Sequence, residues 1–351
     1  MSATDEAVVL DAIRAGDEFA FVSLAERHRW QLHVHCYRML GSFDEAEDMV
    51  QETFLRAWKA RHTFEGRSQF RTWLYSIATN ACLNVLERSP RRILVPDIPP
   101  TDPGRRLTAD ERPDLDALPA DLPWLEPYPD RLLDRAASEQ AGPEAVTVAR
   151  ETIELAYLAA IQHLPPRQRA IFILRDAYGW SADETARLLE TTVASVNSGL
   201  QRARATMRAT LPARRLEWTS AQAPTDEERA ILRRFMDAHD RADVAAFSAL
   251  LAEDARQAMP PNPLRYEGRD ALVTLFTNYV YPDAIHHPGE LRRVETAANR
   301  QPASATYLRR RRDTEFRLLG LDVLELRNGL VANITSFGSP LLGRFGLPSI
   351  L

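Results

Sequence analysis

Residues 44–58 read DEAEDMVQETFLRAW, and this stretch decides how the first third of the chain folds. Its apolar residues recur at the spacing of a helix, and Ser42 with Glu45 forms a capping-box pattern ahead of them. We therefore predict a helix over about 43–60. The opposite face of this helix is polar and mostly acidic, and it carries Asp44, Glu45, Asp48, Gln51 and Glu52. In an isolated helix such a face is most often simply solvated.

A second helix is predicted to follow, because apolar residues keep the 3.6-residue period from Phe70 to Leu86 after an N-cap at Ser68. Its inner face, with Trp73, is expected to be core. Its outer face is expected to expose Tyr75 and Asn80, with arginines near its end. An exposed aromatic ring among small polar groups and arginines can hold a single nucleic-acid strand by stacking and phosphate neutralisation.

Local charge divides the chain more clearly than its net charge of −5 does. Residues 61–92 carry six arginines against two acids, and residues 191–215 carry five arginines and no acid. Between them, residues 97–144 hold twelve acids against five arginines. A pI near 6.0 argues against bulk nucleic-acid binding, but the pattern indicates two basic modules joined by an acidic connector.

Composition excludes several other classes. Two cysteines, Cys36 and Cys82, cannot form a disulfide framework, which favours a reducing cytoplasm. The sequence has no run of 18 apolar residues, so we expect no membrane span. It also lacks paired Cys/His spacing, so no metal site and no cofactor are predicted.

The second basic module reads as a helix-turn-helix. LPPRQRAIFILRD (164–176) begins a helix with proline in its first turn, and Ser181 with Glu184 forms another capping box. A basic helix over 193–208 follows a short turn, so its first half is expected in the major groove. Base edges would be reached by Ser195, Asn197, Ser198 and Gln201. Phosphates would be reached by Arg202, Arg204 and Arg208.

From Thr225 onward the pattern changes to α+β. Helices are predicted over 225–239, 243–251 and EGRDALVTLFTNYV (267–280), followed by several strands between 290 and 338, with Asn328-Gly329 as a hairpin turn. Histidines and carboxylates are available for catalysis, but nothing in their spacing brings them together, so no catalytic residue is predicted. They are His239, Asp240, Asp254, His286 and His287.

The first module resembles region 2 of extracytoplasmic-function (ECF) sigma factors, through DEAEDMVQETFLRAW, TFEGRSQF and FRTWLYSIATNACL. In that family the acidic helix docks on the beta-prime clamp helices of core RNA polymerase. The resemblance therefore makes the acidic face of the 43–60 helix a polymerase contact. It also implies a site that draws a minus-ten base out of the stack, made by Phe64, Arg67, Ser68, Tyr75, Asn80 and Arg88. Thr79 stands where many relatives have arginine.

The second module is similar to sigma region 4, through LPPRQR and SVNSGLQRAR, which implies recognition of the minus-thirty-five element. Relatives commonly have basic residues where Asn197 and Gly199 stand. The last segment resembles the SnoaL-like branch of the cone-shaped NTF2-like fold. The whole chain most closely resembles the actinobacterial sigma-G type of the family.

We therefore predict a multidomain chain with two all-α sigma domains and an α+β cone. Residues 1–95 would be sigma region 2, 96–140 an acidic linker, 141–215 region 4, and 222–351 a SnoaL-like regulatory domain with a small-molecule ligand. Core polymerase and promoter DNA would be its partners, and a separate anti-sigma factor would be unnecessary. Two alternatives stay open: a one-component helix-turn-helix regulator with a ligand sensor, and a SnoaL-like enzyme with an appended DNA-binding part.

The acidic connector contains LPWLEPYPDRLLD (122–134), which resembles a stretch that sigma factors of this type carry. By composition alone it is a stiff proline-rich spacer. Its large apolar side chains are costly to leave in water, so Trp124, Leu125 and Tyr128 are expected to anchor on a surface, and we favour the C-terminal domain.

Overall fold

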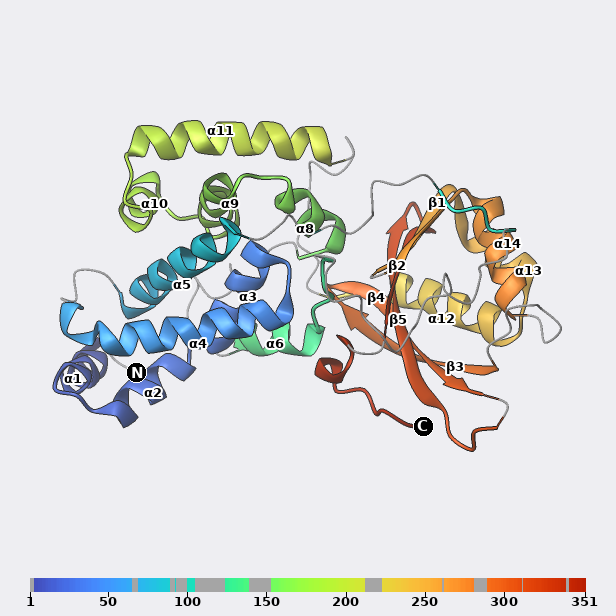
Figure 1. The fold of residues 1–351 in the computed structure, drawn as a ribbon, viewed down its shortest axis with the longest axis horizontal. Helices are drawn as coiled ribbons and strands as arrows, with labels where there is room; N and C mark the ends of the chain where they lie inside the picture. The colour runs from blue at the N-terminus through green and yellow to red at the C-terminus, as the bar shows by residue number, and fades with distance from the viewer. Residues whose placement is uncertain are drawn as a thin grey trace. The chain divides into compact units, whose positions relative to one another are not determined.

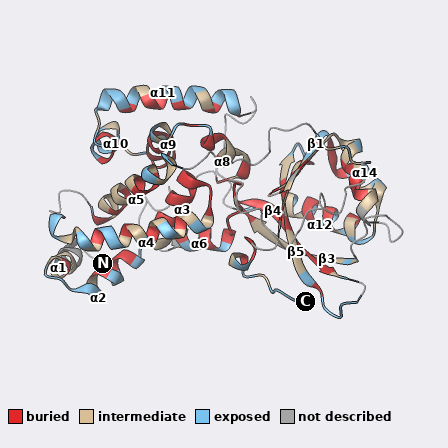
Figure 2. Cartoon of the chain, viewed as in Figure 1, coloured by how far each residue is buried: buried red, intermediate tan, exposed pale blue. Residues whose placement is uncertain are grey.

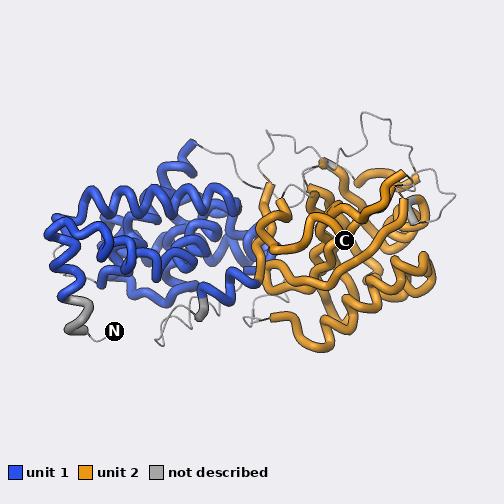
Figure 3. Tube along the Cα trace, turned by 90° about the horizontal axis from the view of Figure 1, so that it is seen from below, with its two compact units in different colours: residues 1–92, 131–220 blue, residues 93–130, 221–351 orange. Residues whose placement is uncertain are grey.

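A computed structural model describes most of the chain and divides it into two compact units. Unit 1 comprises residues 1–92 and 131–220, and unit 2 comprises residues 93–130 and 221–351 (Figure 3). The described residues are 3–64, 69–88, 92, 100–104, 124–138, 153–211, 223–260, 262–280, 289–310, 312–338 and 341–351. Across them, no helix combines the length and apolar character that crossing a bilayer requires.

The first part of unit 1 is a helical bundle (Figure 1). It contains α1 (Ala3–Arg14), α2 (Glu18–Glu26), α3 (Arg29–Leu40), α4 (Phe43–Lys59), the short η1 (Arg61–Thr63) and α5 (Phe70–Leu86). Helix α4 confirms the helix expected over 43–60, and Ser42 accepts a hydrogen bond from the Glu45 amide at 3.2 Å. Helix α5 begins after Gln69, and Ser68, the expected cap, lies outside the described residues.

The second part of unit 1 contains the helix-turn-helix. Its elements are α6 (Asp130–Ser138), α8 (Leu155–Gln162), α9 (Pro166–Phe172), the π-helical turn η2 (Ile173–Ala177), α10 (Ala182–Leu188) and α11 (Val193–Thr210). Ser181 and Glu184 form both hydrogen bonds of the predicted capping box, at 3.1 and 2.8 Å. The Thr192 side chain caps the start of α11 by accepting a hydrogen bond from the Ser195 amide at 3.1 Å, so both helices begin with a side-chain cap.

Unit 2 is an α+β domain built on one mixed sheet, which confirms the predicted fold class. The elements are α12 (Asp226–Asp240), α13 (Val244–Leu250), β1 (Leu251–Met259), β2 (Asn262–Glu267), α14 (Arg269–Val280), β3 (Glu290–Ala298), β4 (Gln301–Arg309), β5 (Arg317–Arg327), β6 (Leu330–Gly338) and η5 (Gly343–Phe345). The strand order is β2-β1-β6-β5-β4-β3, with β1 and β6 parallel and the other neighbours antiparallel. Strands β1 and β2 were not expected from the sequence.

Two hairpin turns in this sheet have left-handed backbone. Asn328 and Gly329 (φ 54° and 75°) join β5 to β6, as the Asn-Gly pair predicts. Asn299 and Arg300 (φ 56° and 60°) join β3 to β4 in the same way, without a glycine. Asparagine tolerates this conformation better than most residues, which explains why Asn299 can occupy the first position of the β3–β4 turn.

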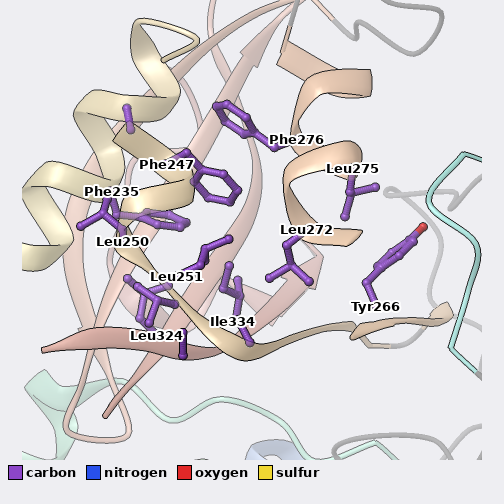
Figure 4. Close-up of a cluster of buried hydrophobic side chains, with 14 of the residues drawn as sticks. Phe235, Phe247, Leu250, Leu251, Tyr266, Leu272, Leu275, Phe276, Leu324 and Ile334 are labelled. Atoms are coloured by element: carbon purple, nitrogen blue, oxygen red, sulfur yellow. The ribbon is translucent and has the colours of Figure 1, made fainter. Parts of the chain in front are cut away.

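Helices α12, α13 and α14 cover one face of the sheet and enclose an apolar cluster (Figure 4). The rings of Phe247 and Phe276 stack at 4.3 Å between centroids, and Phe235 lies 5.9 Å from Phe247. Figure 2 shows α12 with buried residues on one side and exposed residues on the other. Burying these side chains supplies the main stabilisation of the domain.

Candidate polymerase and nucleic-acid interfaces

The polar face of α4 lies opposite its buried stripe. Asp44, Asp48 and Gln51 are exposed, whereas Glu45 and Glu52 are half-buried. Glu45 pairs with Arg92 at 2.8 Å and Glu52 with Arg56 at 2.6 Å. All five side chains follow one side of the helix at i, i+3 and i+4 spacing, and the exposed Leu55 extends the same side. The face can therefore meet a basic protein surface along about three turns.

Tyr75 is not on an exposed face, so the expected position of this aromatic ring is wrong in this conformation. It is 0% exposed, and its ring lies 5.6 Å from that of Tyr178 and 5.8 Å from that of Trp180. Burial raises the pKa of Tyr75 to about 12. The covering rings lie about a hundred residues downstream, in the helix-turn-helix part of unit 1, so helical periodicity within α5 could not reveal them.

The other minus-ten candidates differ in exposure. Phe64 is 6% exposed, because its ring packs 5.0 Å from Trp73 and 5.8 Å from Phe70. Asn80 is half-buried and Arg88 is exposed. Arg67 and Ser68 lie outside the described residues. Phe64 thus contributes to the core together with Phe70 and Trp73 of α5.

A neutral histidine links the two parts of unit 1. His35 of α3 lies with Nε2 2.9 Å from Thr79 Oγ1 and Nδ1 3.2 Å from the Tyr178 hydroxyl. Thr79 donates its only hydroxyl proton to the Tyr75 carbonyl at 2.7 Å, so His35 Nε2 must donate to Thr79. The Tyr178 hydroxyl then donates to Nδ1. Burial, reinforced by the charge of Arg38, lowers the pKa of His35 to about 3.

Arg169 of α9 makes a second link between the same two parts. It is 3% exposed, and its Nη1 donates to the Met39 carbonyl in α3 and to Gln162 Oε1, the latter at 2.8 Å. Its Nη2 donates to the Gln162 carbonyl at 3.0 Å. Burial lowers the pKa of Arg169 to about 10. Arg169 stands in the LPPRQR motif, yet the sequence alone gave no sign that it is buried.

The recognition helix α11 presents most of its predicted contacts to solvent. Ser195, Asn197, Gln201, Arg202, Arg204 and Arg208 are exposed, and Ser198 is half-buried. Arg204 makes two bonds to the Asp176 carboxylate, at 2.8 and 2.6 Å, which raise its pKa. A carboxylate partner weakens the electrostatic pull of Arg204 on a DNA phosphate.

Beside α11 lies a pocket of about 300 Å³ between this helix, α9 and the turn. Its lining includes Arg167, Ser195 and Gly199. A Cβ at Gly199 would stand 2.7 Å from Ile171 Cδ1, so the glycine permits close packing of α11 on α9. Close packing offsets part of the roughly 1 kcal/mol that glycine costs inside a helix.

The connector stretch packs into unit 2 at the β3–β4 turn. Trp124, Leu125 and Tyr128 are 6%, 0% and 0% exposed. The Tyr128 amide donates to Asn299 Oδ1 at 2.8 Å, and the Asn299 amide donates to the Tyr128 carbonyl at 2.9 Å. Pro129 forms a β-bridge with Ala298.

Two charged contacts flank this docking point. The Arg300 amide donates to Asp130 Oδ1 at 2.8 Å, and Arg344 pairs with Glu126 at 2.9 Å. The receiving residues of the turn, Asn299 and Arg300, were missed by sequence reasoning. The sequence signal that could have predicted this turn is Asn299, a residue type common in turns, between the two predicted strands.

The histidines and carboxylates of unit 2 that were considered for catalysis do not form one group. His239 is enclosed by the rings of Phe235, Phe247 and Phe276, and burial, more than any other effect, lowers its pKa. Asp254 pairs with Arg327. His286 and His287 lie outside the described residues. Over the described ranges, no three metal-ligating side chains gather in one place.

Comparison with known families matches three parts of the chain. Residues 24–92 match sigma-70 region 2, residues 154–207 match sigma-70 region 4, and residues 232–334 match the SnoaL-like domain. The first two ranges contain α4, α5 and the helix-turn-helix, and the third contains most of the sheet of unit 2.

Individual relatives agree. The chain is 38% identical to the ECF RNA polymerase sigma factor SigG of Mycobacterium tuberculosis, over 96% of this chain and 86% of that protein. It is 30% identical to the sigma-E factor of Escherichia coli, over 57% of this chain and 91% of that protein. The crystal structure of M. tuberculosis SigJ superposes with a TM-score of 0.58 at 20% identity, covering 92% of this chain and 98% of that one. The alignment with SigG spans nearly the whole chain, including the acidic helix, the helix-turn-helix and the α+β domain, and the chain belongs to the family of ECF RNA polymerase sigma factors.

Proposed function

We propose that this chain binds core RNA polymerase through the acidic face of α4 and directs promoter recognition and melting in the cytoplasm. The observation that carries the proposal is the exposed stripe of Asp44, Asp48 and Gln51 on a helix that lies inside the region 2 match. A row of exposed acids suits reversible docking on a basic partner. In this role α11 reads the minus-thirty-five element. A one-component regulator would leave the α4 face without a use.

Promoter binding requires the two parts of unit 1 to separate. The minus-ten and minus-thirty-five elements lie about 25 base pairs apart, or roughly 85 Å at 3.4 Å per base pair. A hydrogen bond of 3.2 Å between His35 Nδ1 and the Tyr178 hydroxyl joins α3 to the helix-turn-helix part. Tyr75 becomes available to a flipped base only when Tyr178 and Trp180 move away. The described conformation is then the resting form of the free protein.

We further propose that unit 2 regulates the sigma modules in cis and is not an enzyme. The docked connector supports this role, because Tyr128 and Asn299 tie the segment between the two sigma regions to the regulatory domain. A tethered domain acts at an effective concentration near mM, so it can replace a separate anti-sigma factor.

Run-off transcription with core polymerase tests these roles. Full-length protein is compared with a chain truncated after residue 215, on a promoter found by genomic footprinting. We expect both to bind core and to differ in promoter-dependent transcript. Failure of the full-length chain to copurify with core would refute the sigma role, and equal transcript from both chains would refute cis regulation. Steady multiple turnover of a small molecule by residues 222–351 within the full chain would refute the non-enzymatic role.

A further inference from the structure

Four polar side chains form a patch on the inner face of the sheet of unit 2, which we call the interior polar patch: Arg293 of β3, Ser304 and Thr306 of β4, and Asp322 of β5. Arg293 pairs in register with Thr306, and Ser304 with Asp322, so all four side chains project from one face. Asp322 Oδ1 accepts a hydrogen bond from Ser336 of β6 at 2.6 Å.

The patch faces the helices. Leu324, two residues after Asp322, belongs to the apolar cluster that α12–α14 enclose, so the patch shares the face shown in Figure 4. Asp240, at the end of α12, lies 3.9 Å from Arg293 Nη1, too far for a hydrogen bond. Burial lowers the pKa of both Arg293 and His239, and the charge of Arg293 adds to the effect on His239. Arg293, His239 and Asp240 therefore share one region at the end of α12.

Most of this polar capacity is unused. The side chain of Arg293 is 6% exposed, and Ser304 and Thr306 are 0% and 6% exposed. Within the described part of the chain, Arg293 Nε and Nη1, Ser304 Oγ and Thr306 Oγ1 are buried without a hydrogen-bond partner. Buried polar groups in proteins are almost always satisfied, and several bare donors in one patch are exceptional.

The types of group in the patch define what it can hold. A guanidinium and two hydroxyls can all donate, and the fork geometry of a guanidinium matches the two oxygens of a carboxylate. Asp322 accepts from Ser336 and has further lone pairs for a hydroxyl of the guest. Asp240 is 45% exposed, so water screens its competition for Arg293.

We propose that the interior polar patch binds a small carboxylate, and a hydroxycarboxylate in preference to a plain one. The carboxylate accepts from Arg293, Ser304 and Thr306, and the hydroxyl donates to Asp322. The inference rests on the proposed regulatory role of unit 2, for which it supplies the chemical class of the signal.

Binding is tested on the full chain with lactate, 3-hydroxybutyrate and benzoate, each beside its primary amide. Thermal shift and calorimetry are expected to detect the acids and not the amides. Arg293→Gln is expected to raise the Kd by about tenfold or more, because it removes the charge-assisted bonds. Arg292→Gln is the matched control: Arg292 is exposed, stacks on Phe316 at 4.3 Å and projects from the opposite face of the same strand, so its Kd stays unchanged.

Thr306→Val covers the case in which Arg293→Gln fails to fold, since it keeps the side-chain shape and removes one donor. It is expected to weaken binding severalfold. The proposal is overturned if acids and amides bind alike, if neither variant changes the Kd, or if no acid binds at millimolar concentration, which would leave the patch hydrated only. Run-off transcription reads sigma activity separately. A chain that initiates transcription and binds no acid refutes the ligand alone.

Discussion

Mild acid is expected to destabilise unit 1 through two buried histidines. Burial is the main cause that lowers the pKa of His28 to about 4 and that of His35 to about 3, against 6.5 in the unfolded chain. A group with a lowered folded pKa binds protons first in the unfolded state. The stabilisation is therefore fully present above pH 6.5 and declines as the pH falls toward 4 and then 3.

The magnitude follows from proton linkage. At pH 5 the unfolded state gains about 2 kcal/mol from each histidine, so unit 1 loses about 4 kcal/mol relative to pH 7.5. Carboxylates with lowered pKa, such as Glu184, respond at more acidic pH and contribute little in this window. The neutral form of His35 is also the one that accepts from Tyr178, so acid weakens the link between the two parts of unit 1.

Hydrogen exchange of peptides from α3 and α5, corrected for the intrinsic pH dependence of exchange, measures this loss without assuming that the whole chain unfolds together. His35→Gln is expected to remove about half of the pH dependence, or roughly 2 kcal/mol between pH 7.5 and 5. His62→Gln, at an exposed position, should leave it unchanged. If His35→Gln retained the full wild-type dependence, the assignment of a buried neutral His35 would be wrong.

Three further perturbations test separate sites. Asp48→Arg reverses a charge on the exposed face of α4, so the affinity for core polymerase should fall at least tenfold. The free energy of unfolding should change by less than about 0.5 kcal/mol, because the site is on the surface. Retained copurification with core would contradict this prediction. Gly199→Ala should gain less than the roughly 1 kcal/mol expected from helix propensity, because its Cβ displaces Ile171 Cδ1, and a double-mutant cycle with Ile171→Val by urea unfolding should show a favourable coupling, since valine lacks that atom. Asn299→Gly keeps the left-handed turn but loses the bond to the Tyr128 amide, so proteolysis of the connector should accelerate by about five- to tenfold, whereas Asn328→Gly, at the other hairpin turn, should have no such effect.

Local signals predicted helices α4, α5 and α11 and the β5–β6 hairpin, but they missed strands β1 and β2. The caps at Ser42 and Ser181 and the Asn328-Gly329 turn act within a few residues, so the sequence spacing alone can reveal them. The burial of Tyr75 was not predictable in this way, because Tyr178 cannot be placed over α5 by any periodicity within α5. Exposure of a helical face depends on the tertiary partner, which is a non-local property.

The same distinction explains which candidate contact residues are exposed and which are buried. Charged residues of α4 and α11 resist burial, so their exposure follows from residue type alone. Aromatic residues carry no such constraint, and Phe64 and Tyr75 are both buried. A family resemblance assigns such residues a role in the DNA-bound state, whereas the free chain protects them from water.

The connector leads into α6, which has hydrogen-bond partners at both of its ends. Asp130 is the last residue of unit 2 before the chain enters unit 1, and it is also the first residue of α6. Its carboxylate accepts a hydrogen bond from the Arg300 amide at the β3–β4 turn. Later in the same helix, the Ala136 carbonyl accepts a hydrogen bond from Gln31 of α3. Unit 2 therefore holds the first residue of α6, and α3 of unit 1 holds a residue later in the same helix. The β3–β4 hairpin, whose strands carry Arg293 and Thr306 of the interior polar patch, thus contacts the first residue of α6 directly.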